Sequence, residues 1–220
     1  YNIFLIIYWG YRVKEGSYKK IVVLGCGGAI GGELLKQLSS KYPNARIHGF
    51  SRATPSNVLD NVRYHQIDYL NEESIEHAAS VASQDEKVDM VWVATGILHD
   101  GSIQPEKNLR ELSKEKFMHL YEINTVFPAL AAKHFLPQLV KDKKAVFAAM
   151  TARVGSVSDN HLGGWYSYRC SKAALQMLIK NASIEVGRLN SNAVIVGLHP
   201  GTVDSHLSKP FQSYVQEGHL

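Results

Sequence analysis

Two residues near the C-terminal end of the chain, Tyr168 and Lys172, have side chains suited to proton transfer, and they are four positions apart. On a helix this spacing puts both side chains on one face, one turn apart. A nearby positive charge favours the phenolate form of tyrosine and so lowers the phenol pKa from its usual value near 10. Lowering it by about three units takes roughly 4 kcal/mol, which a close cation in a dry site supplies. The pair therefore predicts acid–base chemistry at the Tyr168 hydroxyl.

A third polar residue, Asn124, falls inside a predicted helix. Asparagine forms helices poorly, so an interior one has either an exposed side chain or a local hydrogen-bonding role. None of the ten histidines occurs at a metal-binding spacing such as H-E-x-x-H, so we expect no metal site. The two cysteines, Cys26 and Cys170, are too far apart in sequence for a zinc or redox motif, and we expect both to be buried in a reducing compartment.

A glycine-rich segment lies near the other end of the chain. Gly25, Gly28 and Gly31 form the pattern G-x-x-G-x-x-G between a β-branched run at 20–25 and an amphipathic stretch at 29–40. Missing side chains let the backbone turn tightly and let its N–H groups reach a diphosphate, and the helix N-terminus adds a partial positive charge. The segment predicts a dinucleotide site; the alternative is a tight strand-to-helix turn without a ligand.

The alternation of strand and helix patterns continues along the chain. Further strands are predicted at 45–50, 62–67, 88–94, 145–151 and 193–198. Further helices are predicted at 71–83, 113–138 and 164–189, with Asn71 as an N-cap and a kink or an interruption at Pro128. Strands separated by such helices imply right-handed crossovers and a parallel sheet covered on both faces. We therefore predict the α/β class, with a single Rossmann-type doubly wound parallel sheet of about six strands.

Ligands of such sheets bind beyond the carboxyl ends of the strands, near the point where the strand order reverses. Most of the candidate residues fall at those strand ends: Gly25, Gly28, Ala29, Ile30, Gly31, Ser51, Arg52, Asp68, Ala94, Thr95, Gly96, Thr151, Pro200 and Gly201. Because these ends meet at one edge of the sheet, the sequence predicts one elongated pocket for a cofactor and a substrate.

The end of the second predicted strand bears on which dinucleotide binds. NAD-selecting domains place an acidic residue there to accept a hydrogen bond from the ribose 2′-hydroxyl, whereas this chain has Ser51 and Arg52. A hydroxyl and an arginine suit a 2′-phosphate instead, so we favour NADP as the cofactor, with NAD as the alternative. Asp68, after the third strand, either accepts from the adenine amino group or caps the turn toward Asn71.

Composition sets the broad class of the protein. At 220 residues, with 45% hydrophobic and 20% charged residues, the chain suits one globular domain. The net charge of +4 comes from scattered lysines, so we expect no nucleic-acid partner. The apolar run at 3–9 is too short to span a bilayer and lacks the features of a signal peptide, so we expect no membrane partner and a cytoplasmic location. We interpret residues 1–17 as an extension and residues 18–220 as the domain.

These motifs together resemble the short-chain dehydrogenase/reductase family, over about residues 20–209. The stretch from Ala152 to Arg169 is similar to a narrower group, the C-factor-like oxidoreductases. The resemblance implies hydride transfer between NADP(H) and a small carbonyl or alcohol substrate, with Tyr168 as the acid or base. It also implies that Lys172 lowers the tyrosine pKa and holds the ribose, that Asn124 holds a water linking Lys172 to solvent, and that Pro200, Gly201, Thr202 and Val203 border the nicotinamide carboxamide.

The chain departs from the family pattern in three places. Both asparagines of the usual Asn-Asn-Ala-Gly motif are absent from Val93-Ala94-Thr95-Gly96. At the position where the family has its catalytic serine, this chain has Ala152. We therefore take Thr151 as the replacement for that serine, with Ser156 as the alternative. The chain ends before the family's seventh strand, which usually helps to form oligomers, so we expect a C-terminally truncated domain whose full-length form is a homo-oligomer.

The sequence also allows two other functions. One is a non-catalytic NAD(P)-binding redox sensor or signalling protein of the same fold, which Ala152 and the missing asparagines favour and the intact Tyr168, Lys172 and Asn124 oppose. The other is a structural or interaction domain without a nucleotide.

Overall fold

The computed structural model describes residues 18–53, 58–101, 103–201, 203–205 and 208–214. Its strands are β1 (Lys20–Leu24), β2 (Arg46–Ser51), β3 (Val62–Gln66), β4 (Met90–Val93), β5 (Ala145–Met150) and β6 (Ala193–Leu198). The α-helices are α1 (Ala29–Lys41), α2 (Glu72–Ser83), α3 (Lys114–Tyr121), α4 (Phe127–Phe135) and α5 (Tyr166–Leu189). Short helical turns are η2 (Leu109–Glu111), η3 (Glu122–Val126), η4 (Leu136–Gln138), η5 (Arg153–Gly155) and η6 (Lys209–Tyr214).

The six strands form one parallel sheet in the order β3-β2-β1-β4-β5-β6. The order reverses between β1 and β4, so the carboxyl ends of these two strands flank the switch point at which such sheets bind ligands. This topology confirms the predicted Rossmann-type fold.

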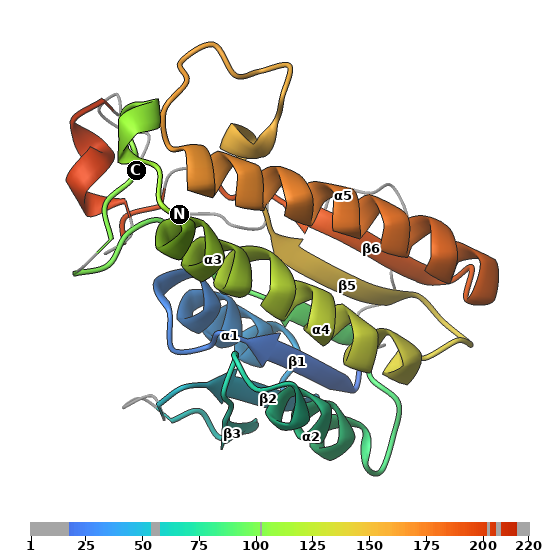
Figure 1. Cartoon of the computed structure of the whole chain (residues 1–220). Coiled ribbons are helices and arrows are strands. Elements are labelled where there is room, and N and C mark those ends of the chain that lie inside the picture. Colours follow the sequence, from blue (N-terminus) through green and yellow to red (C-terminus); the bar gives the residue numbers. More distant parts are fainter. Residues whose placement is uncertain (1–17, 54–57, 102, 202, 206–207, 215–220) are drawn as a thin grey trace.

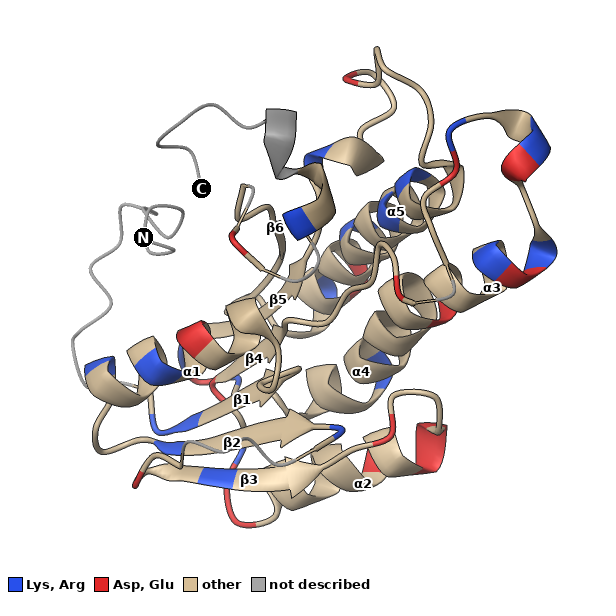
Figure 2. Ribbon diagram, turned by 90° about the vertical axis from the view of Figure 1, so that its left-hand side faces the viewer, with Lys and Arg blue, Asp and Glu red and all other residues tan. Residues whose placement is uncertain are grey.

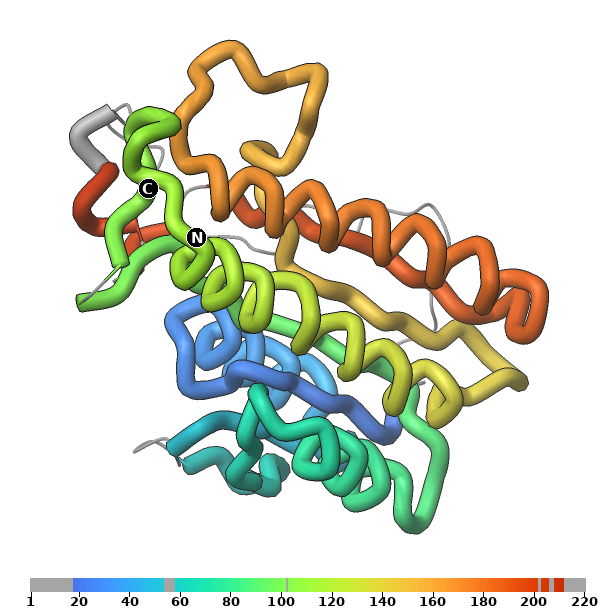
Figure 3. Tube along the Cα trace, in the orientation of Figure 1, coloured from blue at the N-terminus to red at the C-terminus, as the bar shows by residue number. Residues whose placement is uncertain are grey.

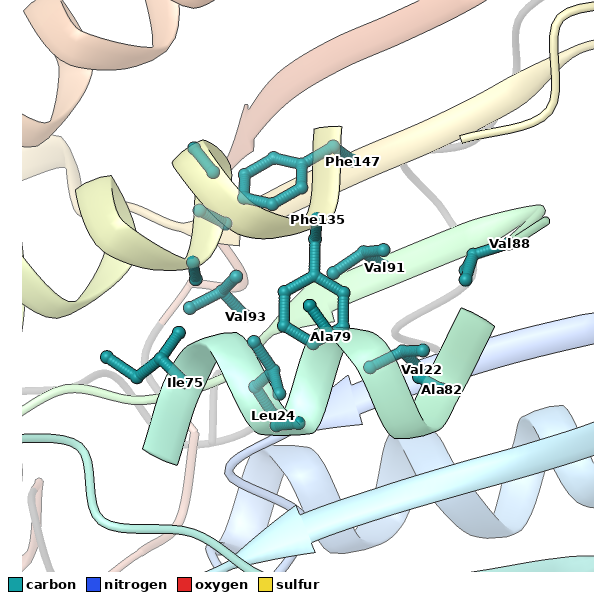
Figure 4. Packing of buried hydrophobic residues seen from close by; sticks show 14 of the residues in the cluster. Val22, Leu24, Ile75, Ala79, Ala82, Val88, Val91, Val93, Phe135 and Phe147 are labelled. Atoms are coloured by element: carbon teal, nitrogen blue, oxygen red, sulfur yellow. The ribbon is translucent and has the colours of Figure 1, made fainter. Parts of the chain in front are cut away.

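The sheet is covered on both faces, with α1 on one side and α2, α4 and α5 on the other (Figure 1). Leu34, Leu35 and Leu38 of α1 pack against one face of the sheet. On the opposite face, Ile75 and Ala79 of α2 and Phe135 of α4 meet the strand side chains in a cluster that includes Val91 and Phe147 (Figure 4). Because both faces are buried, the central strands consist almost entirely of apolar residues, as parallel sheets require.

The predicted helix at 113–138 is interrupted, although not at Pro128. The chain forms α3, then a π-helical turn at Glu122–Val126, then α4, in whose first turn Pro128 lies without needing an N–H partner. The two helices nevertheless continue as one rod (Figure 3). The π turn is the important difference because Asn124 lies inside it.

Other boundaries follow the sequence with small shifts. Asn71 is the N-cap of α2, as predicted, and accepts from the Glu73 and Ser74 N–H groups. Val88 forms only an isolated bridge with Leu139, so β4 begins at Met90. Helix α5 begins at Tyr166 rather than at 164, because Gly163, Gly164 and Trp165 all have positive φ. Residues 1–17 and Thr202 lie outside the described residues.

Acidic and basic residues are interspersed over the helices in the view of Figure 2. None of the described helices combines the length and apolar character that a bilayer crossing requires.

Candidate active site

Tyr168 and Lys172 lie together in the first turns of α5, as their spacing predicts. Both side chains are buried, with 8% and 3% of their surface exposed. The Lys172 Nζ atom lies 5.9 Å from the centroid of the Tyr168 ring and donates a hydrogen bond of 2.8 Å to the carbonyl of Met150, the last residue of β5. The ammonium is therefore fixed between α5 and the carboxyl edge of the sheet.

The pKa values of the pair differ from the prediction. Burial raises the pKa of Tyr168 to about 12, whereas we expected Lys172 to lower it. Burial also lowers the pKa of Lys172 to about 8. Removal from water disfavours both charged forms, and it outweighs the attraction that the prediction relied on. The phenol is consequently protonated at neutral pH, and the amine remains largely charged.

Asn124 links the elements that surround this pair. Its side chain is fully buried; Oδ1 accepts from the Ile97 N–H and Nδ2 donates to the Ile97 carbonyl, both at 2.8 Å. Nδ2 also donates to the Ser171 hydroxyl at 3.1 Å, and Ser171 in turn donates to the Tyr168 carbonyl at 2.8 Å. The amide thus connects the loop after β4 to α5, so the Asn124 side chain is not exposed, and its hydrogen bonds reach distant segments.

Two glycines allow the close packing around Lys172. A Cβ atom at Gly96 would lie 3.3 Å from the Lys172 Nζ atom and 3.6 Å from Asn124 Oδ1. A Cβ atom at Gly155 would lie 2.7 Å from the backbone carbon of Lys172, closer than real Cβ contacts occur. The loop after β4 and the η5 turn therefore both reach the lysine through positions without a side chain.

The glycine-rich turn lies at the switch point, and the structure separates the roles of its three glycines. Gly25 has φ +92° and lies against Ala94 and Thr95, where a Cβ would be 3.0 Å away. A Cβ at Gly31 would lie only 2.2 Å from the Gly25 carbonyl oxygen, whereas one at Gly28 would lie at an ordinary 3.4 Å. Gly25 and Gly31 are therefore required by the fold, and Gly28 is not.

The N-terminus of α1 has the character of an anion site. Ala29 and Ile30 begin the helix, Gly28 is its N-cap without a side-chain hydrogen bond, and no acidic residue occupies the first turn. The first N–H groups of a helix lack intrahelical partners and carry a partial positive charge. A glycine-rich turn that leads into such a helix, with its Cys26 side chain buried, fits the diphosphate of a dinucleotide.

Ser51, the last residue of β2, lies beside this turn, since a Cβ atom at Gly27 would lie 3.3 Å from the Ser51 Cβ atom. The Ser51 hydroxyl donates to the Ala53 carbonyl at 2.5 Å, and Arg52 has an exposed side chain. Asp68 accepts from the Leu70 N–H at 2.9 Å, which is the turn-capping alternative, and it stays exposed. Arg52 thus provides an exposed positive charge directly after β2.

The two hydroxyls proposed to replace the missing serine, those of Thr151 and Ser156, form hydrogen bonds with the backbone. Thr151 directly follows β5, and its hydroxyl donates to the Leu198 carbonyl of β6 at 3.1 Å. Ser156 accepts from the Asp159 N–H at 3.3 Å within its own loop. A residue that orients a substrate oxygen must donate a hydrogen bond to it, and the Thr151 proton is already donated to the sheet.

An apolar cluster adjoins the Tyr168 ring on the other side. It contains Leu98 and Leu120, with Ile97, Ile103, Ala152, Val154, Trp165 and Phe211 packed against them. The Trp165 indole makes edge contacts with the rings of Tyr168 at 6.3 Å and Phe211 at 4.9 Å. Pro200, Gly201 and Val203 follow β6 on the way to Phe211, and Gly201 has φ +78°.

Several residues of this site were not predicted from the sequence. Ser171 was not singled out, although it lies between Tyr168 and Lys172. The predicted residues also omitted Gly155, Trp165 and Glu106, whose carboxylate accepts from the Ser167 N–H at the start of α5. Cys170 was predicted to be buried, but it is exposed. It lies two positions from both Tyr168 and Lys172, and residues two apart on a helix point to opposite sides. Among the described residues, no group of three His, Cys, Asp or Glu side chains could hold a metal ion.

Comparisons with known proteins agree with this geometry. The family profile described as short chain dehydrogenase matches residues 19–215. An uncharacterized oxidoreductase of Schizosaccharomyces pombe is 27% identical over 203 residues, covering 86% of this chain and 76% of the relative. The C-signal protein of Myxococcus xanthus is 36% identical over 90 residues, covering 41% of this chain and 53% of its own. The NADPH-bound carbonyl reductase from chicken fatty liver superposes with a TM-score of 0.73 at 21% identity, covering 88% and 80% of the two chains.

Proposed function

The chain belongs to the short-chain dehydrogenase/reductase family of oxidoreductases, and from this premise we propose that it reduces a carbonyl substrate with NADPH, with Tyr168 as the proton donor. The observation that carries the proposal is the buried pair of Tyr168 and Lys172 beside the carboxyl ends of β4 and β5. The bound cofactor would supply the hydride. The chain's own residues would bind and orient both reactants and deliver the proton.

The protonation state of the pair fits the role of proton donor that the proposal gives to Tyr168. With a pKa of about 12, the Tyr168 phenol holds its proton at neutral pH and can donate it to a carbonyl oxygen that gains negative charge. Lys172, with its pKa near 8, keeps a positive charge near the ring and stabilises the phenolate left after donation. Asn124 would keep the loop after β4 and helix α5 in place around Lys172. The water that the family resemblance implies at Asn124 would return a proton from solvent to the site.

The glycine turn supports a dinucleotide, and Arg52 supports NADP over NAD. The first amides of α1, including those of Ala29 and Ile30, would take the diphosphate, while Arg52 would pair with a 2′-phosphate. The NADPH found in the carbonyl reductase of chicken fatty liver agrees with this choice. Pro200, Gly201, Thr202 and Val203 would border the nicotinamide.

The test of the proposal combines binding and turnover. NADPH and NADH are titrated by fluorescence, and absorbance at 340 nm is then followed with a panel of aldehydes, ketones and quinones. The apolar cluster around Tyr168 favours carbonyls with apolar or aromatic substituents. Ala152 supports a second candidate, a non-catalytic NADPH sensor. Tight NADPH binding without turnover of any carbonyl would establish the sensor and reject the reductase.

Restoring the hydroxyl at position 152 is expected to raise activity. Ala152→Ser should increase kcat by about tenfold or more, because one hydrogen bond to the developing oxyanion contributes on the order of 10² in rate. Thr151→Val, measured beside it, should lower kcat by less than about threefold if the bond to Leu198 is its only role. A hundredfold loss in Thr151→Val would instead assign the substrate-orienting role to Thr151.

Arg52 is expected to determine the cofactor preference. Arg52→Ala should weaken NADPH binding by about tenfold, because a charge-assisted bond to the 2′-phosphate contributes about 1.5 kcal/mol or more, and NADH binding should change little. Arg63→Ala is the matched control, since Arg63 is an exposed arginine on the adjacent strand β3. Equal losses for NADPH and NADH in Arg52→Ala would contradict the assignment.

A further inference from the structure

A buried carboxylate from a distant part of the chain lies at the start of helix α5. Glu106, in the connection between β4 and η2, has 1% of its surface exposed. Its Oε2 atom accepts from the Ser167 N–H at 3.2 Å, and its Oε1 atom accepts from the Ser167 hydroxyl. The Glu106 backbone carbonyl also accepts from the Trp165 N–H at 2.5 Å. One residue therefore makes three hydrogen bonds to the segment immediately before Tyr168.

These bonds replace a cap that the helix lacks. The N-cap residue of α5 is Trp165, which has a left-handed backbone with φ 51° and ψ 41° and a side chain that cannot accept a hydrogen bond. A left-handed conformation is unfavourable for a bulky residue and persists only where its surroundings hold it. Glu106 provides both the missing acceptor and the carbonyl that holds Trp165, and its negative charge is favourable at a helix N-terminus.

The position of this cap connects it to the reaction. Ser167 directly precedes Tyr168, so the direction of the first turn determines where the phenol points. The Trp165 indole lies against both the Tyr168 ring and Phe211, and its orientation depends on the same left-handed residue. Movement of this turn would displace the Tyr168 hydroxyl and the Trp165 indole together. Displacements of about 1 Å can lower rates by about 10²-fold.

We propose that Glu106 is a positioning residue that holds the first turn of α5, and with it Tyr168 and the Trp165 indole, in the arrangement needed for proton donation. The kinetic part of this proposal rests on the proposed carbonyl reductase activity. The structural part does not, because it concerns contacts that exist without a substrate.

The test compares Glu106→Ala and Glu106→Gln with Glu111→Ala. Glu111 is the control, at the end of η2: its carboxylate is exposed and accepts from the Lys107 N–H and from Asn108 Nδ2. We expect Glu106→Ala to lower kcat by about 10- to 100-fold while the NADPH dissociation constant changes less than about threefold. Glu106→Gln keeps an acceptor oxygen of the same reach and should recover most of that loss, and Glu111→Ala should match the parent protein.

Hydrogen exchange measured by mass spectrometry gives the readout that needs no activity. The amides in the first turn of α5 should exchange faster in Glu106→Ala and not in Glu111→Ala, while the rest of α5 stays protected. If Glu106→Ala does not fold, Ser167→Ala tests the same contact from the other side and should show the same local loss of protection. Parent-like kcat with unchanged exchange would overturn the proposal. A parent protein that reduces no carbonyl, but whose Glu106 variant shows the local exchange change, would reject the reductase and leave the positioning role intact.

Discussion

Replacing Tyr168 with phenylalanine is expected to lower kcat for carbonyl reduction by about 10³-fold or more, because the reaction then loses the group that donates its proton. The substitution removes one oxygen atom from a side chain that is 8% exposed and has no described hydrogen bond at its hydroxyl, so packing and folding should be retained. The NADPH dissociation constant should change less than about tenfold, because the diphosphate site at α1 is untouched.

The measurement is kcat and KM for the best carbonyl of the panel, with NADPH affinity and far-ultraviolet circular dichroism recorded on the same preparations. Tyr166→Phe is the control, since it makes the same chemical change two residues earlier on α5 and its ring is half-buried. A Tyr168→Phe enzyme that keeps full turnover would show that another group delivers the proton, and the assignment of the site to this tyrosine would then be wrong.

The architecture could be predicted from the sequence because it depends on repeated patterns. The central strands β1, β4 and β5 are short apolar runs, and the helices between the strands bury one face. The candidate residues follow the strands along the chain, so a parallel sheet brings them to one edge regardless of side-chain detail. The four-residue spacing of Tyr168 and Lys172 likewise fixes their common face. These inferences need only the period of each element and the direction of the chain.

What the sequence did not reveal depends on burial and on contacts between distant segments. The predicted direction of the Tyr168 pKa shift was wrong. The local sequence shows the nearby Lys172, but it does not show how completely the apolar cluster around Tyr168 removes water from the ring. Glu106 was missed because its partner Ser167 is 61 positions away. Asn124, in the π turn, bonds to Ile97 and Ser171, which are 27 and 47 positions away, and helix propensity shows neither contact. Trp165 in a left-handed conformation is equally a product of the segment that holds it.

The glycine turn provides the second large effect, and it tests the cofactor site without reference to Tyr168. Gly31→Ala would place a Cβ atom 2.2 Å from the Gly25 carbonyl oxygen and 2.8 Å from its carbonyl carbon, and neither backbone group can move without separating α1 from β1. We expect a loss of about 3 kcal/mol or more in stability, beyond the usual cost of overpacking, because backbone rather than a flexible side chain is displaced. We also expect NADPH binding to weaken by about 100-fold or more as the turn opens.

Gly28→Ala is the matched control, because it adds the same methyl group three residues earlier in the same turn. Its Cβ would lie 3.4 Å from the same carbonyl oxygen, and the Gly28 backbone, at φ −85° and ψ 166°, is open to any residue. Its cost in stability should be about 1 kcal/mol or less. Thermal unfolding and fluorescence titration of both variants measure these effects. The G-x-x-G-x-x-G pattern treats the three glycines alike, whereas the packing of α1 on the turn makes Gly31 essential and Gly28 replaceable. Equal effects at the two positions would show that the turn does not meet the helix as the structure has it, and the diphosphate site would lose its basis.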